Sequence, residues 1–542
     1  MRLGKLLFIA LMLLCACLVL QAAIGTNSSL PNEPHVTDSP SPIHCLGAQD
    51  LLDTSFRDEL NFGAESNPTG SPIGGGDGYQ DIITVNAGAT YTVTTTEELL
   101  AALRDVNSGD TIYIDEKAQI DLADTPEGAI IPGGVTLASN RGERKAAGSA
   151  VYSFEIEEPG EYVFWGLASA SSEDDGSFWI SVDRDEFQQW DINADPDWNW
   201  SRVGRHYLSS GRHVLTVQWR GDNSKLDTIF VTDRDSPPET ALNEHGIAMQ
   251  IWMEGESAIL SPPMKAVPDP AASGGAYISV PEGSGMGEYP ISPGGKISLG
   301  SASPDRDYIV GLIIGGEDIR ITGLRIEGPH KTTSSVSPTT IGIISLYRNL
   351  EVDNCEIFGW GNAAIGLIGT GGADMKTGGY IHHNYIHHNQ MVGFGYGVSV
   401  SNGAVALIEA NYFDYCRHGI AGAGDAGDGY EARYNICGPN WFGISPHNFD
   451  MHGKPNPNGS GTIAGDTIKI HHNTFLGTTS DMPTCIAIRG MPRDGAYIDH
   501  NWFYFTRDAP VWQTGGRGNV SVTDNLIGED KYFSASGPIK YY

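Results

Sequence analysis

A single asparagine recurs at the same place in six short strand-like segments of the C-terminal half, and this repeat constrains the fold more than any other feature. The six are Asn384, Asn411, Asn435, Asn473, Asn501 and Asn525. Their spacing never falls below that of Asn411 and Asn435, and it is widest between Asn435 and Asn473. Weaker copies at 320–326 and 351–357 carry Leu324 and Cys355 at that place. A constant minimum spacing with variable excess predicts a fixed coil that bears loops of different length.

One such coil cannot bury its apolar side alone, so neighbouring coils must stack into a solenoid. The stack needs two inward ladders, one on each side of the asparagine: Ile381, Ile408, Ala432, Ile470, Ile498 and Val522 before it, and Ile386, Phe413, Cys437, Phe475, Phe503 and Ile527 after it. We expect each asparagine to occupy a tight bend in left-handed geometry, with stacked amides bonded to one another. An amphipathic segment at 95–106, opened by Thr95 and Glu98 at capping-box spacing, predicts a helical cap over the N-terminal end.

A second strand follows each bend and begins in most coils with glycine and an apolar residue, as in GIISL (342), GVSVS (397), GIAGA (419) and GISPH (443). This rhythm of strand, bend, strand, turn and strand resembles the pectate-lyase-like superfamily over roughly 80–142 and 295–530. The resemblance implies an all-β fold, a right-handed parallel β-helix. It does not fix an activity, because this architecture hosts lyases, hydrolases, epimerases and inert adhesins.

The coil pattern stops after LASNRG (137–142) and resumes near GGKISLG (294–300). The interval contains SFEIEEPGEYVFWG, GRHVLTVQWRGDNSKLDTIFVTD and then WMEGESAIL, which resemble carbohydrate-binding modules of family 6 and family 35. The strand that usually opens such a module follows the one that usually closes it, which indicates a circularly permuted, inserted β-sandwich of jelly-roll type. The predicted organisation is a signal peptide (1–25), a Ser/Pro/Asn-rich linker (26–79), a cap with the first coils (80–142), the sandwich (143–290) and the main β-helix (291–542).

The module resemblance implies a structural calcium ion held by Glu254, Glu256 and Asp227, and carboxylate oxygens suit such a hard cation. Exposed aromatic rings would contact glycan, since the C–H face of a sugar packs on a ring. The candidates are Trp198, Trp200, Trp179 and Tyr277, although a sandwich core also needs large residues.

The N-terminal segment, 1–25, combines Arg2 and Lys5 with an apolar run and small residues at Ala22 and Ala23, which is typical of an export signal. We therefore expect a secreted or cell-surface monomer with no stable membrane span once the signal is removed. A net charge of −33 argues against nucleic acid as a partner and leaves a polysaccharide as the expected one. The five cysteines beyond the signal permit one or two disulfide bridges but not a disulfide framework.

In the superfamily that the chain resembles, substrate lies along the strand that begins with Gly-Ile. Small floor residues there, Ser399, Ala421, Ser445 and Ala487, would leave a channel open. One border would carry Tyr396, Arg417, His418, Trp441 and Phe442, and the other would carry His447 and Arg489. A long loop after them holds Asp450 and His452.

These residue types favour proton abstraction beside a carboxylate, which needs a base and a cation to stabilise the enolate. The predicted function is a lyase or epimerase on a uronate-containing glycan, with Arg417, His418, His447, Asp450, His452 and Arg489 as the catalytic candidates. Calcium in the groove, or a metal held by His447, Asp450 and His452, remains an alternative. A non-catalytic glycan-binding or adhesive protein is a second reading, and a glycoside hydrolase with two facing carboxylates is a third.

A second polar column, on the strand before the asparagine, contains His382, Glu409, Arg433, His471 and Asp499, flanked by Glu431 and Lys469. Because its charges alternate in sign from coil to coil, we expect a lattice that satisfies itself and serves structure.

Overall fold

The computed structural model describes residues 61–541, except 126–127, 146, 172–175, 184, 193–194, 222–223, 239–248, 285, 301–307, 331–338, 442–446, 478–483, 505–508, 529–531 and 537–538. The predicted signal peptide, the first part of the predicted linker and the groove candidates Phe442 and Ser445 therefore lie outside the described residues. The chain forms two compact units, Met1–Gly142 with Pro293–Tyr542, and Glu143–Ser292. No helix of the described chain is long and apolar enough to cross a membrane.

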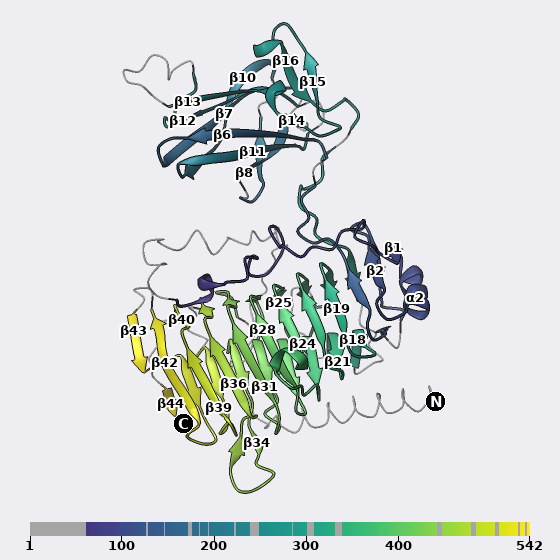
Figure 1. Cartoon of the computed structure of the whole chain (residues 1–542), viewed down its shortest axis with the longest axis vertical. Coiled ribbons are helices and arrows are strands. Elements are labelled where there is room, and N and C mark those ends of the chain that lie inside the picture. Colours follow the sequence, from purple (N-terminus) through teal and green to yellow (C-terminus); the bar gives the residue numbers. More distant parts are fainter. Residues whose placement is uncertain are drawn as a thin grey trace, which may run out of the picture. The chain divides into compact units, whose positions relative to one another are not determined.

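The first unit is a right-handed parallel β-helix whose coils stack in three columns of strands (Figure 1). The column before the bend comprises β1 (Tyr91–Val93), β2 (Thr111–Ile114), β5 (Thr136–Ala138), β19 (Ile319–Thr322), β22 (Leu350–Asp353), β25 (Tyr380–His382), β28 (Val405–Glu409), β31 (Gly429–Arg433), β36 (Thr467–His471), β39 (Gly495–Asp499) and β42 (Val520–Ile527). The column after the bend comprises β3 (Gln119–Asp121), β17 (Lys296–Ser298), β20 (Arg325–Glu327), β23 (Glu356–Phe358), β26 (Tyr385–His387), β29 (Tyr412–Asp414), β32 (Ile436–Cys437), β37 (Thr474–Phe475) and β40 (Trp502–Phe503).

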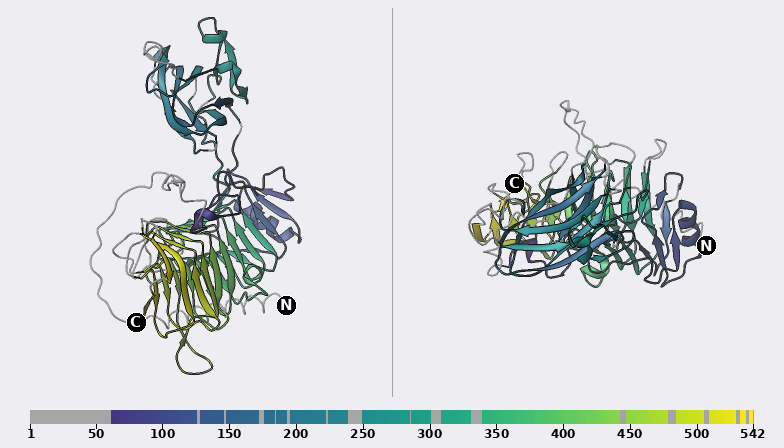
Figure 2. Two further views of the ribbon diagram at one scale, coloured as in Figure 1. Left: turned by 60° about the vertical axis from the view of Figure 1, so that its left-hand side comes forward. Right: turned by 90° about the horizontal axis from the view of Figure 1, so that it is seen from above.

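The third column forms a separate parallel sheet, which carries the candidate site. Its strands are β4 (Ala129–Ile131), β18 (Tyr308–Ile314), β21 (Thr339–Ser345), β24 (Ala363–Ile368), β27 (Tyr396–Ser401), β30 (His418–Gly422), β33 (Phe449–Met451), β38 (Ile486–Ile488), β41 (Val511–Gln513) and β44 (Ile539–Tyr541). A hairpin of β34 (Lys454–Pro455) and β35 (Thr462–Ile463) leaves the longest coil after β33, and β43 (Tyr532–Ser536) pairs antiparallel with β42. Figure 2 shows the strands following one another along the solenoid.

The predicted inward ladders are confirmed, because their members are buried in one continuous core apart from the half-buried Ile527 at the end. The predicted cap is helix α2 (Thr96–Asp105), which begins with the capping box of Thr95 and Glu98. A short second helix, α4 (Met375–Gly378), precedes β25. The four described cysteines, Cys355, Cys416, Cys437 and Cys485, are buried free thiols, so none of them forms a disulfide bridge.

The asparagines form an internal amide ladder, but they do not occupy the left-handed position of the bend. That position belongs to the preceding residue, for example Ala410 (φ 52°) and His472 (φ 55°). Each asparagine instead turns inward and bonds to the next: the Asn411 Nδ2 donates to Asn435 Oδ1 over 3.0 Å, and the Asn435 Nδ2 to Asn473 Oδ1 over 2.9 Å. The sequence places the bend correctly and misses its left-handed residue by one.

Residues 61–79, predicted as linker, lie along the bends instead. The Gly63 amide donates to the His500 carbonyl over 2.9 Å and the Gly74 amide to the Ala410 carbonyl over 2.9 Å. Tyr79 is buried, and its hydroxyl donates to Asp353 over 2.8 Å. Only the short turn η3 (Ala64–Ser66) is regular. Because these contacts join the N-terminal segment to coils that come much later in the sequence, no local pattern predicts them.

Histidines occupy the left-handed position at several bends, and their surroundings make the β-helix sensitive to acid. Burial, together with a neighbouring histidine, lowers the pKa of His383, His388 and His472 to about 4. Since the folded state prefers the neutral ring, the stability is fully present above the ordinary value near 6.5 and is lost as the pH falls toward 4.

We expect each of these histidines to cost the fold about 1–2 kcal/mol between pH 7 and pH 4, after allowance for partial exposure. His472→Asn keeps a residue that tolerates left-handed geometry and removes the titration. The variant should therefore lose less thermal stability than the natural chain between pH 7 and pH 4.5, measured by circular dichroism. An equal loss in both proteins contradicts the assignment.

The second unit is a two-sheet sandwich. One sheet contains β7 (Gly160–Ala170), β10 (Asp195–Leu208), β12 (Lys225–Thr232), β13 (Gln250–Glu254), β15 (Lys265–Pro268) and β16 (Ala276–Ser279). The other contains β6 (Ser149–Ile156), β8 (Ser177–Val182), β9 (Gln188–Asp191), β11 (Gly211–Trp219) and β14 (Ile259–Leu260), and the turns η4 (Gly255–Ser257) and η5 (Ser273–Gly275) complete the unit. The incoming and outgoing segments pair, since the Ser292 amide donates to the Glu143 carbonyl over 2.9 Å, so the insertion interrupts the β-helix at one place.

Candidate functional site

The outward face of the third sheet carries one buried carboxylate among small residues. Asp450 lies in the middle of β33, in register with Ala421 of β30 and Ala487 of β38. The sequence analysis expected Ser445 at this floor position and Asp450 on a loop. The difference arises because the strand of this coil begins Phe-Asp-Met and lacks the Gly-Ile signature of its neighbours.

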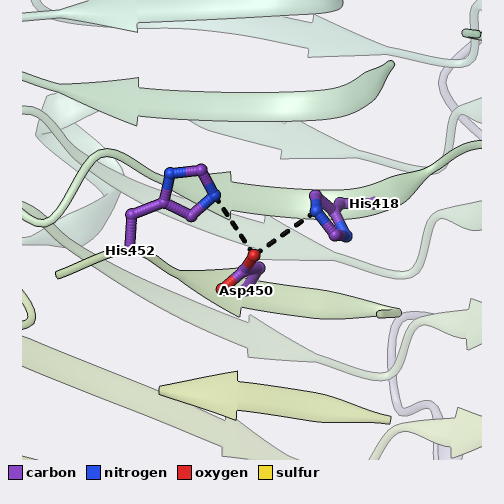
Figure 3. A group of neighbouring side chains, drawn as sticks. All are labelled: His418, Asp450 and His452. Atoms are coloured by element: carbon purple, nitrogen blue, oxygen red, sulfur yellow. Dashed lines mark ion pairs between the residues drawn. The ribbon is translucent and has the colours of Figure 1, made fainter. Parts of the chain in front are cut away.

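Two imidazoles lie beside that carboxylate (Figure 3), and a guanidinium also contacts it. The Nε2 of His418 lies 3.3 Å from Asp450 Oδ2, and the Nε2 of His452 lies 3.2 Å from the same oxygen. An Nη of Arg489 also contacts Oδ2. His452 and Arg489 directly follow β33 and β38, so they stand on one border of the floor, while His418 begins β30 on the other.

Three rings stack along that other border. Tyr396 and His418 lie in register with centroids 5.6 Å apart, and His418 and His447 follow at 5.6 Å with an interplanar angle of 2°. His447 therefore stands beside His418, whereas the sequence analysis put it on the border with Arg489. Its Nδ1 lies 3.3 Å from the Thr484 carbonyl.

The surroundings keep the Asp450 carboxylate charged and the His418 and His447 rings neutral. Burial acts to raise the pKa of Asp450, but the His452 and Arg489 side chains outweigh it and hold that pKa well below its usual range. Burial lowers the pKa of His418 well below its ordinary value and also lowers that of His447. Two imidazoles able to accept a proton or bind a cation thus lie beside a fixed negative charge.

Several polar atoms of this cluster are buried and make no hydrogen bond, which is unusual in a folded protein. They include Nε2 of His418, His447 and His452, together with Oδ1 of Asp450. Both side-chain amide atoms of Asn448 are in the same position. This concentration of unpaired buried polar atoms makes the cluster the candidate functional site of the β-helix.

The remaining groove candidates have supporting positions. Tyr396 is buried, and burial raises its pKa. Arg417 donates to the Gly393 carbonyl over 3.2 Å, and Trp441 packs against the core with its Nε1 on the Gly438 carbonyl at 2.7 Å. Trp512 was missed, although it lies in register with Ala487 of the neighbouring strand. It continues the floor beyond Ala487, and its ring centroid lies 5.5 Å from that of His447.

The second polar column forms the self-satisfied lattice that the alternating charges predict. Arg433 contacts Glu409 at 2.6 Å and Glu431 at 3.1 Å, and Lys469 and His471 reach Glu431 at 3.3 and 3.5 Å. Since each of these charges has a partner, we interpret the column as structural.

In the sandwich, the three predicted calcium ligands gather around Ser273. The Ser273 amide donates to Asp227 Oδ2 over 3.0 Å, and its hydroxyl donates to Glu254 Oε1 over 3.0 Å. Glu256 lies against the adjoining Gly274. Asp227 Oδ1 and Glu256 Oε2 are buried without hydrogen bonds, and burial with the charges of Glu254 and Glu256 raises the pKa of Asp227 to about 6.

The predicted aromatic residues of the sandwich are all half-buried, in pairs. Trp198 contacts Tyr277 edge to face at 5.5 Å, and Trp179 contacts Tyr289 at 5.2 Å. Trp200 meets Trp252, whose centroid lies 6.0 Å away. Trp252 is 46% exposed and was missed, although its alternation with the buried Met253 marks it as outward-facing.

Comparison with known proteins yields no matching family model and no matching curated protein. Among solved structures, the chain is similar to a ruminal GH26 endo-β-1,4-mannanase, with 22% identity and a TM-score of 0.15 over 19% of this chain and a fifth (20%) of the mannanase. It is also similar to the catalytic unit of a GH87 α-1,3-glucanase from Streptomyces thermodiastaticus strain HF3-3, with 11% identity and a TM-score of 0.25 over 72% of this chain and 86% of that one. The Agl-KA catalytic domain has 11% identity and a TM-score of 0.16 over 73% and 85%. At these scores, the fold assignment rests on the strand register itself.

Proposed function

We propose that the chain is a secreted or cell-surface polysaccharide lyase or epimerase that acts on a uronate-containing glycan along the floor of β27, β30, β33 and β38. The observation that supports this most is the convergence of His418, His452 and Arg489 on the ionised Asp450. Among the described residues, this cluster contains one carboxylate. Paired-carboxylate hydrolysis needs two, whereas proton abstraction needs a base and a cation.

In this proposal, a uronate carboxylate lies over the floor and meets the Arg489 guanidinium, whose side chain is 31% exposed. An imidazole, His447 or His452, removes the proton from C5 of the uronate. The electron pair passes to the carboxylate as an enolate, which the cation stabilises.

Elimination follows when the C4–O bond breaks, a C4–C5 double bond forms, and the leaving oxygen takes a proton from solvent. Return of a proton to the opposite face of C5 gives the epimer instead. Trp512, at the end of the floor, offers a ring on which a neighbouring sugar can stack.

The test is a panel of uronate and neutral glycans incubated with the purified chain. The absorbance of unsaturated uronate reports elimination, and solvent deuterium incorporated at C5 reports epimerisation. Loss of either signal in His447→Ala or Arg489→Ala supports the proposal. Hydrolysis of a neutral glycan, or glycan binding without any turnover, contradicts it and favours a hydrolase or an adhesive protein respectively.

We further propose that the sandwich binds glycan through its half-buried aromatic pairs and the exposed Trp252, and that it holds calcium at Asp227, Glu254 and Glu256. Three carboxylates gathered around one serine, with two buried oxygens that lack a hydrogen bond, support this proposal, because a hard cation would balance their charge.

Calcium at 100 times its dissociation constant is expected to stabilise the sandwich by about 2.7 kcal/mol, because binding to the folded state alone shifts the unfolding equilibrium. A calorimetric scan with calcium and then with chelator measures this. The double variant Glu254→Gln/Glu256→Gln should abolish the shift, whereas Glu282→Gln, at an exposed glutamate of the same unit, should keep it. An unchanged shift in the double variant contradicts the site.

A further inference from the structure

Three side-chain atoms, one each from His418, Asp450 and His452, have the spacing of metal ligands. His418 Nε2 and His452 Nε2 lie 3.3 and 3.2 Å from Asp450 Oδ2, and the three atoms lie within 4.8 Å of one another. With bonds of about 2.0–2.1 Å, tetrahedral coordination places neighbouring ligand atoms about 3.3–3.4 Å apart. The two observed distances match this separation, so an ion could bind here without a large movement of the backbone.

Hydrogen bonds do not explain why the Nε2 atoms of His418 and His452 lie so close to Asp450. The two Nε2 atoms are buried and make no hydrogen bond of acceptable geometry, although each lies within ion-pair distance of the carboxylate. Because neither Nε2 has the direction of a hydrogen bond to Oδ2, its lone pair can point instead at a cation that lies between the three atoms.

The outer contacts hold the rings in place for this role. His418 Nδ1 lies 2.9 Å from the His447 carbonyl and 3.1 Å from the His447 amide. In the tautomer that donates to the carbonyl, Nε2 keeps the lone pair that a metal ion needs. A histidine that binds a metal commonly donates its other N–H to such a carbonyl. His418 and Asp450 are fully buried, whereas the side chain of His452 is 23% exposed, so His452 is the residue of the three that lies nearest to solvent.

We propose that His418, Asp450 and His452 bind one divalent transition metal ion of the zinc type, with a further coordination position open to the groove. Two nitrogen donors and one carboxylate suit zinc and its neighbours, whereas calcium prefers oxygen alone. Arg489 contacts Asp450 Oδ2 in the structure, and the unbonded Oδ1 gives its guanidinium an alternative partner when the ion takes Oδ2.

This metal site does not depend on the proposed lyase activity. It does limit which histidine can act as the catalytic base. With the Nε2 of His452 on the metal, His447 remains the imidazole whose Nε2 is not a ligand. A metal facing the open side would act beside Arg489 as a second cation for a substrate carboxylate.

The test measures metal content rather than activity. The full chain is stripped with chelator, dialysed against equal concentrations of Zn²⁺, Mn²⁺ and Ca²⁺, and analysed by mass spectrometry of the elements. We expect one zinc per chain, in addition to any calcium in the sandwich. Cobalt loaded in its place should give the visible absorption of a coordinated ion.

His452→Ala, at the most exposed ligand, and Asp450→Asn should each lower the zinc content at least tenfold. His500→Ala is the matched control, because it removes a half-exposed histidine of the same unit that lies outside the cluster. It should keep one zinc. Absence of bound zinc in the natural chain, or a zinc content unchanged in His452→Ala with its fold intact by circular dichroism, overturns the proposal.

Discussion

Arg489→Ala is expected to lower the rate of product formation on a uronate glycan by about 100- to 1,000-fold, the usual cost of removing one group that stabilises a developing negative charge. Arg489 is the partly exposed cation of the cluster, and it stands on the floor's border beside His452. The change removes that cation while His418, Asp450 and His452 stay in place. The effect should therefore fall on turnover, with zinc content preserved.

Arg493→Ala is the matched control for this prediction. Arg493 follows Arg489 closely in the same chain segment and pairs with the part-exposed Asp466 at 3.2 Å, away from Asp450. Its loss should leave turnover within about twofold, since exposed pairs of this kind contribute little. Arg489→Lys should recover part of the rate, because lysine keeps the charge but lacks the planar fork of donors.

In the metal-free chain, Arg489→Ala also leaves Asp450 with two imidazoles and no permanent cation. We expect a stability cost of about 3 kcal/mol, at the lower end for breaking a buried pair because those contacts remain. Turnover must therefore be compared at a temperature at which circular dichroism shows both proteins folded. Equal rates in Arg489→Ala and Arg493→Ala would remove Arg489 from the mechanism.

The β-helix was predictable because the same kinds of inward-facing side chains recur in every coil. The asparagines and their flanking apolar ladders specify stacking, and stacking leaves few alternatives for the backbone. The prediction failed in the coil whose third strand does not follow the repeat. Asp450 lies on a strand that has no Gly-Ile start, so the rule that located Ala421 and Ala487 pointed to Ser445 instead.

The docking of residues 61–79 shows a different limit. Its contacts are made by backbone amides and by single side chains such as Tyr79. Such contacts do not recur at a regular spacing, so no sequence pattern predicts them. The candidate site falls between these cases. The sequence analysis named all four members of the cluster, His418, Asp450, His452 and Arg489. It did not predict their contacts, because His418 and Asp450 come from different coils and meet only if the coil between them has the right length.

The interior of the ladder gives the largest expected effect on stability. Asn435 makes four buried hydrogen bonds through its side chain: its Nδ2 donates to the Ile408 carbonyl and to Asn473 Oδ1, both over 2.9 Å. Its Oδ1 accepts from the backbone amide and from the Nδ2 of Asn411, over 2.9 and 3.0 Å. Alanine at this position would leave partners on neighbouring coils without hydrogen bonds and out of reach of water.

We therefore expect Asn435→Ala to destabilise the β-helix by about 3–5 kcal/mol, since each unsatisfied buried group costs about 1–3 kcal/mol and the partners can relax only in part. Asn458→Ala, at an exposed asparagine of the same long coil, should change stability by less than about 0.5 kcal/mol. The measurement is urea unfolding of both variants, followed by circular dichroism. Similar midpoints would mean that the apolar ladders alone hold the coils together. A large difference would mean that the amides, which cannot slip by a residue without losing every bond, also fix the register that brings His418 beside Asp450.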